Sequence, residues 1–270
     1  MLTIRTNTAA TQAKKDYNSA SKEMASSFGH LSSGYRITKA SDDSAGLSVG
    51  TNLTAQIQSL KQTTRNAMDG LSALQTVEAS LAAGQELLSR LRQLTMQSIS
   101  DGVGAGQRDM IQSEMGQVLA ELGRISEVTE FNGMRLLDGS VSSLDFQIGI
   151  RGGDDDYITL EPKNVGLTSL GLDAFSGASS QALQQIDDAL ETISDLRAEF
   201  GAAQNRLTSV VTTIGSNLDS LNAGRSRVMD TDVAKEVANI SNKQVVQQAG
   251  ASVIKNSYAF TQTALKILEG

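Results

Sequence analysis

The chain of 270 residues has no cysteine, no tryptophan and a single histidine, His30. Without cysteine it can form neither disulfides nor thiolate metal sites. One histidine also excludes His/Cys metal sites and Cys–His catalysis, and a Ser–His–Asp triad would depend on His30 alone. We find no other convergent group of polar residues. The sequence therefore predicts no metal, no cofactor and no enzymatic activity.

Proline and large apolar residues are also scarce. Pro162 is the only proline, aromatic residues make up 4% of the chain, and hydrophobic residues make up 39%, below the roughly 45–50% of an average globular domain. A spherical core built from so few large side chains would be weak, whereas thin helical bundles tolerate this composition. Because an interior proline disrupts a helix, its scarcity also favours long helices.

Long apolar runs are missing as well. Residues 1–15 contain none, so we expect no cleaved signal peptide. No segment reaches 18 apolar residues, so we expect no membrane insertion. The net charge of −7 argues against nucleic acid as a partner. Both ends are nevertheless basic: residues 1–40 carry six Lys/Arg against two Asp/Glu, and residues 235–270 carry four against two. Such matching ends indicate that the two termini act together.

Apolar residues recur at alternating spacings of three and four over much of the chain, a pattern typical of helices that pack lengthwise on one another. The longest such segment, Leu53–Ser98, predicts a helix of roughly 70 Å. Residues 109–128 and 183–221 repeat the pattern and supply two partners for it. The stripe of the long helix comprises Leu53, Ile57, Leu60, Thr64, Ala67, Leu71, Leu74, Glu78, Leu81, Leu88, Leu91 and Thr95.

The terminal segments 1–32 and 233–270 are predicted to be amphipathic helices. In the first, the apolar residues are small, so it would be marginally stable alone. Segments of this kind often stay disordered until they meet copies of themselves or a partner. The predicted stripes are Ala13, Tyr17, Ala20, Met24, Ser27 or Phe28, and Leu31 in the first helix, and Val233, Val237, Ile240, Gln244, Ile254, Tyr258, Leu265 and Leu268 in the second.

Loops are predicted at Gly34–Asp43 and Arg225–Asp232, where Ser, Gly and Asp interrupt the helical periodicity. Ser41–Asp43 offer helix caps after the first loop, and Asp230 and Thr231 offer them after the second. The two adjacent carboxylates at 42 and 43 are interpreted as caps and loop acceptors rather than as a cation site.

Two further segments resemble ligand loops but are interpreted as turns. Asp101–Gly106 is rich in glycine, yet a helix precedes it, whereas a phosphate-binding loop needs a strand there. Leu144–Ile150 and Tyr157–Leu160 alternate as two strands. The acidic segment Arg151–Asp156 between them lacks the spaced ligands of a calcium loop.

The resulting layout is mirrored about its middle. It predicts a mainly α fold, a long antiparallel coiled-coil or helical bundle with a small β-hairpin region. Arg90, Arg92 and Leu94 fall outside the simplest stripe of the long helix. We therefore expect a second face there that contacts other subunits.

Several motifs resemble those of bacterial flagellin, and together they cover nearly the whole chain. Leu31–Ile37 and Asp42–Leu47 are similar to the family's LSSGxRI…DDxAGL signature. Further similar motifs are Arg65–Gly70, Thr129–Leu137, Gly201–Leu207, Ala223–Asp232 and Gln247–Gly250.

The resemblance implies a domain plan. Residues 1–43 and 226–270 would form a discontinuous inner filament-core domain with spoke loops, in which the terminal helices pair as a coiled coil. Residues 44–225 would form the outer-tube domain, including a β-hairpin at 144–160. Only residues 173–180 occupy the place of the family's variable outer domains, so we expect none in this chain.

The resemblance also implies the function and the partners. The chain would be a structural subunit that polymerises with itself into the flagellar filament for motility, after type III export to the cell exterior. Implied partners are an export chaperone at the C-terminal helix, and the filament cap and hook-junction proteins. The segment that an animal Toll-like receptor recognises in the family is matched at Arg90, Leu94, Gln97 and Glu114 and departs at Gln93, Thr95 and Met96.

Two alternatives stay open at this point. A hook–filament junction protein shares the two-ended helical plan. A cytoplasmic coiled-coil scaffold would form closed, soluble oligomers and would not be secreted.

Overall fold

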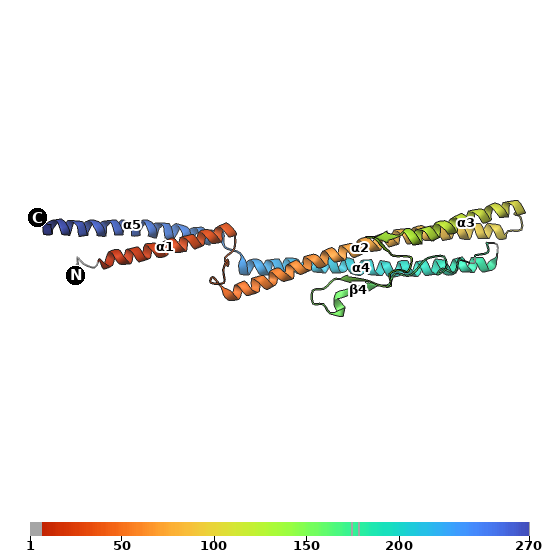
Figure 1. The fold of residues 1–270 in the computed structure, drawn as a ribbon, viewed down its shortest axis with the longest axis horizontal. Coiled ribbons are helices and arrows are strands. Elements are labelled where there is room, and N and C mark those ends of the chain that lie inside the picture. Colours follow the sequence, from red (N-terminus) through yellow and green to blue (C-terminus); the bar gives the residue numbers. More distant parts are fainter. Residues whose placement is uncertain (1–6, 174, 178, 270) are drawn as a thin grey trace. The chain divides into compact units, whose positions relative to one another are not determined.

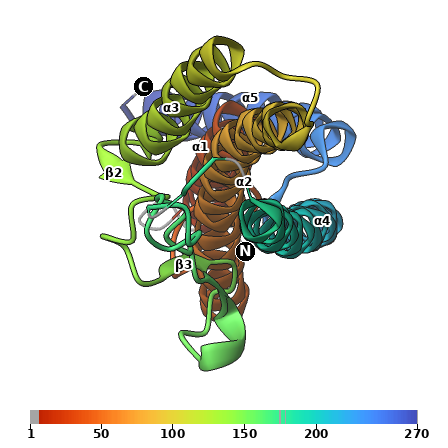
Figure 2. The same cartoon turned by 90° about the vertical axis from the view of Figure 1, so that its right-hand side faces the viewer.

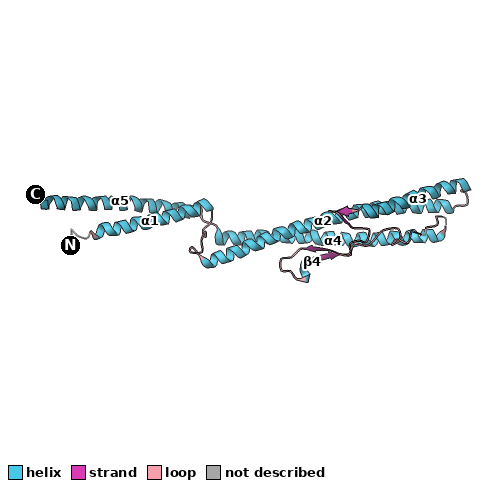
Figure 3. Ribbon diagram, viewed as in Figure 1, coloured by secondary structure: helices cyan, strands magenta, loops and turns pink. Residues whose placement is uncertain are grey.

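A computed structural model describes residues 7–173, 175–177 and 179–269, except for the side chains of residues 260, 261 and 264–269. The chain divides into two compact units. We call Met1–Ala55 with Ser220–Gly270 the terminal unit, and Gln56–Asp219 the central unit. Long helices dominate both, and the strands are confined to two short hairpins of the central unit (Figure 3). The predicted mainly α fold with a small β-hairpin region is confirmed.

The terminal unit is built on helices α1 (Thr8–Ser33) and α5 (Val233–Glu269). The two helices lie side by side and antiparallel, with Asn7 before α1 hydrogen-bonded to Ser257 of α5 (Figure 1). Helix α1 faces α5 with a stripe of small and medium side chains, as its periodicity predicted. The buried members of this stripe are Ala10, Ala13, Ala20 and Ser27, and the half-buried members are Tyr17, Met24 and Leu31.

A loop of residues 34–43 connects α1 to α2 (Ser44–Ile99). Asp43 caps α2: its Oδ1 accepts a hydrogen bond from the backbone N–H of Gly46 at 2.8 Å. Asp42 instead holds the loop, because its Oδ2 accepts from the backbone N–H groups of Thr38 and Lys39, each at 3.0 Å. The interpretation of these two carboxylates as a cap and a loop acceptor is therefore confirmed.

The second loop is shorter than predicted. Helix α4 (Ser180–Met229) continues through the first five residues of the expected Arg225–Asp232 loop, so that prediction is wrong for 225–229. None of these residues is a helix breaker, and Arg36 satisfies the last carbonyls of α4. Its backbone N–H donates to Met229 O and its Nη2 to Val228 O, both at 2.7 Å. The helix α5 that follows is capped by Asp232, not by Asp230 or Thr231 as expected.

The central unit combines the longer parts of α2 and α4 with α3 (Ala105–Val128). Helix α3 folds back antiparallel on α2, as predicted, after a turn at residues 100–104. Arg90 pairs with Glu114 across the two helices, and Arg108 donates to Ser100 O at their turn. Viewed along the helices, α3 and α4 lie on different sides of α2 (Figure 2).

Two antiparallel hairpins flank these helices. The predicted one pairs β3 (Leu144–Gln147) with β4 (Tyr157–Leu160), in the register Leu144↔Leu160 and Phe146↔Ile158. Its acidic turn contains a short helix, η1 (Asp154–Asp156), and Asp156 Oδ2 accepts from the backbone N–H groups of Arg151 and Gly152 at 2.6 Å each. The interpretation as a turn is confirmed.

The other hairpin was not predicted. It pairs β1 (Glu130–Phe131) with β2 (Met134–Arg135) around Asn132 and Gly133, which have φ angles of 52° and 78°. Asn-Gly is the strongest short-range hairpin signal, because both central residues of the tight turn need positive φ. The sequence thus carries a local signal for this hairpin at Asn132 and Gly133.

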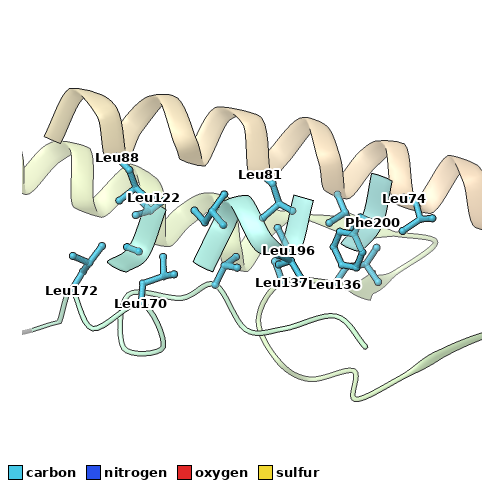
Figure 4. Close-up of a cluster of buried hydrophobic side chains, with 14 of the residues drawn as sticks. Leu74, Leu81, Leu88, Leu122, Leu136, Leu137, Leu170, Leu172, Leu196 and Phe200 are labelled. Carbon is cyan, nitrogen blue, oxygen red and sulfur yellow. The ribbon is translucent and has the colours of Figure 1, made fainter. Parts of the chain in front are cut away.

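The core of the central unit lies between α2, α3, α4 and the segments that connect them (Figure 4). The predicted stripe of α2 supplies Leu74, Leu81 and Leu88, and α4 supplies Leu196 and Phe200, all at most 2% exposed. The connectors also contribute: Leu136, Leu137, Leu170 and Leu172 point into the same cluster (Figure 4). Within the described residues, no helix is both long and apolar enough to cross a membrane.

Candidate interaction surfaces

The inner face of α5 lies against α1 and fixes the register of the pair. Asn7 Oδ1 caps α1 at Ala10 N and accepts from the hydroxyl of Ser257, each at 3.0 Å. Farther along, the side chain of Tyr17 lies beside Gly250, and Lys243 forms an ion pair with Glu23. That pair and a hydrogen bond from Ser19 lower the pKa of the Glu23 carboxyl.

This inner face differs from the predicted stripe of α5. Ile240 is buried and Ile254 half-buried, as predicted, but Val237 is 47% exposed and Val233 56%. Leu265 and Leu268 lie among the residues whose side chains are not described. The residues of α5 that are buried or half-buried are mostly polar or small: Glu236, Ile240, Lys243, Gln247, Gly250, Ile254 and Ser257.

Outside this inner face, the exposed surface of α5 carries five valines, which are spread around the helix rather than aligned in one stripe. We call this exposed surface the valine face. Its members are 44–65% exposed, although each is a residue that is buried in most folded proteins. Phe28 of α1 is also 47% exposed. The valine face comprises Val233, Val237, Val245, Val246 and Val253.

A second candidate surface lies on the central unit around Arg90. Its guanidinium is half exposed and bonds Glu114 of α3, with Nη2–Oε1 at 2.5 Å. Gln97 is exposed too. Leu94, in contrast, is 2% exposed and belongs to the core cluster, so the prediction that it lies outside the packing stripe is wrong. The reason is that α2 is packed by both α3 and α4, which widens its buried face.

Arg92 points toward α4 instead of α3. Its Nε lies 2.7 Å from Asp187 Oδ1, and this hydrogen bond raises the pKa of the guanidinium. A shallow depression lined by Ser89, Arg92, Gln93 and Met96 lies beside it. The side chains of both ion pairs are about half exposed, so these pairs orient side chains more than they stabilise the fold.

We find no candidate catalytic or metal centre in the part of the chain that the structure describes. No group of three or more His, Cys, Asp or Glu residues there is arranged to hold a metal ion.

Two family models match the chain. Residues 4–142 match the bacterial flagellin N-terminal helical region, and residues 183–268 match the bacterial flagellin C-terminal helical region. The chain is 33% identical to a flagellin of Xenorhabdus nematophila, over 98% of each protein. It is 30% identical to the flagellar filament 33 kDa core protein of Treponema phagedenis, over 98% of this chain and 99% of that protein.

A solved structure extends the likeness to the fold. The crystal structure of Bacillus cereus flagellin is 27% identical and superposes with a TM-score of 0.50, over 56% of this chain and 88% of that one. The motifs on which the sequence resemblance rested thus lie in segments that the family models match.

Proposed function

The chain belongs to the bacterial flagellin family, and on that premise we propose that its terminal helices drive assembly through the valine face. As a flagellin, it is a structural subunit of the bacterial flagellar filament, and it polymerises with copies of itself. The alternatives of a hook–filament junction protein and a cytoplasmic scaffold are not favoured by these matches.

The valine face is the observation that carries the proposal. Five valines of α5 are 44–65% exposed, although α5 already pairs with α1. Burying a valine fully contributes about 1.5–3 kcal/mol, so covering this face by neighbouring subunits offsets the entropy lost on association. Contacts between unlike faces of identical subunits build an open helical polymer when the rotation between subunits does not close into a ring.

The predicted domain plan fits this proposal. Residues 1–43 and 226–270 would line the filament core and contribute the valine face, and residues 44–225 would form the surrounding tube, with no outer variable domain. Arg90, Arg92, Gln97 and Glu114 would then contact neighbouring subunits from the tube. Recognition of the same segment by an animal Toll-like receptor is a further proposal from the resemblance, and it would involve the exposed residues rather than Leu94.

We also propose export and delivery as the resemblance implies. A chaperone would cover the apolar face of α5 before assembly, and the chain would leave the cell through the flagellar type III channel. Outside the cell it would meet the cap and hook-junction proteins at the ends of the filament. An exposed valine face is hazardous in the cytoplasm because apolar patches promote aggregation, which supports a protecting partner there.

Truncation tests the role of the termini. A chain that lacks residues 240–270, or one that lacks residues 1–32, should keep a folded central unit, because the core cluster lies entirely within residues 67–207. It should not polymerise when a salt that promotes assembly is added. Circular dichroism would report the remaining helix content, and negative-stain microscopy would report filaments. Filaments of either truncated chain would contradict the proposal.

A point variant tests the valine face itself. Val246→Glu introduces a charge at a 44% exposed position, so it should leave the α1–α5 pair intact while raising the concentration needed for assembly at least tenfold. Gln248→Glu introduces the same charge at an exposed polar position of α5 and serves as the matched control. Equal effects of the two variants would show that charge, rather than loss of the apolar face, determines assembly.

A further inference from the structure

The sole histidine of the chain lies where three segments of the terminal unit meet. His30 is in the last turn of α1, and its ring reaches both the first turn of α5 and the loop that follows α1. Nδ1 lies 2.8 Å from Glu236 Oε1, and Nε2 lies 3.8 Å from Asp42 Oδ2. The three side chains are only 12–24% exposed, so water screens their charges less than it does at the surface.

The surroundings of the ring are acidic. Among the described residues, the charged groups facing it are Glu236 from α5 and Asp42 from the loop, and neither carboxylate forms an ion pair with any other described group. The other side chains that contact Glu236 are neutral: Ser27 and Asn239 donate to its Oε2 at 3.3 and 2.9 Å. One ring thus stands between two negative charges.

Only the protonated ring satisfies both carboxylates. A neutral imidazole has one N–H donor and one lone pair. If Nδ1 carries the proton and donates to Glu236, the lone pair of Nε2 faces the Asp42 carboxylate, which is repulsive. The opposite tautomer places the Nδ1 lone pair 2.8 Å from Glu236. The imidazolium donates from Nδ1 to Glu236 and carries the positive charge that attracts both carboxylates, including that of Asp42 at 3.8 Å from Nε2.

Hydrogen bonds hold both carboxylates in their charged form. Hydrogen bonds from Asn239 and His30 lower the pKa of Glu236, and backbone hydrogen bonds from Thr38 and Lys39 lower that of Asp42. Histidine is the side chain whose charge ordinarily changes between about pH 5 and 8.

We propose that His30, Glu236 and Asp42 form a pH-responsive clasp that joins the end of α1, the following loop and the start of α5 more firmly in mildly acidic than in mildly alkaline solution. Stability that the charged ring contributes is present at low pH and is lost as the pH rises and the ring releases its proton. As the pH falls through the lowered pKa values of the two carboxylates, these groups become protonated as well, so the clasp also weakens in strongly acidic solution.

Hydrogen exchange of the full-length chain, kept unassembled, tests the clasp. Protection factors of amides 24–34 and 234–243, corrected for intrinsic exchange, would be compared at about pH 5.5 and about pH 8. We expect them to be about threefold higher at the lower pH in the wild type. His30→Gln should abolish this difference, and Glu236→Gln should remove most of it.

Glu23→Gln is the matched control. It breaks the Glu23–Lys243 ion pair of the same two helices, and neither of these groups changes charge in this pH range. Its effect on protection should therefore be equal at both pH values. A pH difference that persists in His30→Gln, or protection absent from both segments at both pH values, would overturn the clasp. Filament formation is a separate measurement, so failure of the proposed function would be recognised independently.

Discussion

Gly70 of α2 faces the ring of Phe146 on β3 so closely that a Cβ atom at residue 70 would lie 2.8 Å from Phe146 Cδ1. The absence of a side chain at this position lets the β3–β4 hairpin dock on the long helix. Asn66, one turn earlier, donates to Gln147 O at 3.3 Å and holds the same hairpin.

Gly70→Ala should therefore weaken the docking of the hairpin. An aromatic ring cannot swing aside as a flexible side chain does, so we expect a net loss of about 1–2 kcal/mol despite the better helix propensity of alanine. Gly116→Ala in α3, where no atom would lie within 4 Å of the new Cβ, should instead stabilise the chain by up to about 1 kcal/mol. Urea unfolding followed by circular dichroism measures both, and destabilisation by Gly116→Ala would contradict this account.

Leu88→Ala should create a cavity in the central core. Leu88 is 0% exposed, and truncation of a buried leucine costs about 2–5 kcal/mol. Met110, at 66% exposed, offers a control of similar size, for which replacement by alanine should change the free energy of unfolding by about 0.5 kcal/mol or less. Similar losses from the two variants would show that the core does not pack as described.

Arg197 should contribute more to the free energy of unfolding than the exposed arginines of the central unit do. Its Nε and Nη2 donate to Glu78 Oε1 at 2.9 and 2.7 Å, it also bonds Gln85, and Glu78 Oε2 has no partner among the described atoms. Arg197→Met should cost about 1–2 kcal/mol, because Glu78 is left half-buried without its cation.

Arg92→Met provides the comparison for Arg197. The Arg92–Asp187 pair is almost half exposed on both sides, so its loss should cost about 1 kcal/mol or less. Adding Glu78→Met to Arg197→Met should recover part of the lost stability, since no unpaired charge then remains. Thermal unfolding of the single and double variants would measure the coupling free energy between Arg197 and Glu78. A coupling of zero would contradict a stabilising interaction between these two side chains.

The loop after α1 should loosen in acid. Backbone hydrogen bonds from Thr38 and Lys39 lower the pKa of Asp42 from its ordinary value of 3.8. A carboxyl with a lowered folded-state pKa stabilises the fold above the ordinary value, and this stabilisation is lost as the pH falls through the lowered value. Exchange protection of the Thr38 and Lys39 amides should drop below about pH 4. In Asp42→Asn it should be lower at neutral pH and should change less with acid.

Much of the fold was predictable because its helices are long and regular. The stripes of α1 and α2 appeared in the sequence with the spacing that the structure buries, and Asp43 was among the predicted caps. The Asn132–Gly133 hairpin carried a usable signal. The roles of Leu170 and Leu172 were harder to predict, because a short connector of small residues has no periodicity that indicates which side is buried.

The inner face of α5 could not be predicted from hydrophobicity. Its contacts with α1 are made largely by Glu236, Lys243, Gly250 and Ser257, while valines point outward. An apolar stripe indicates that a surface is buried in the functional state. It does not indicate whether the packing partner is a segment of the same chain or another copy of the protein. Leu94 illustrates the converse: a residue assigned to an intermolecular face is buried within its own chain.

The pairing of α1 with α5 joins two segments that are far apart in sequence, which affects when they can fold together. Glu236 is separated from His30 by 206 positions along the chain, whereas the turns of the central unit connect helices that are neighbours in sequence. Contacts between distant segments form slowly, because the entropy of closing the intervening chain must be lost first. A ribosome makes α1 before α5, so α1 has no partner while the residues between the two helices are synthesised.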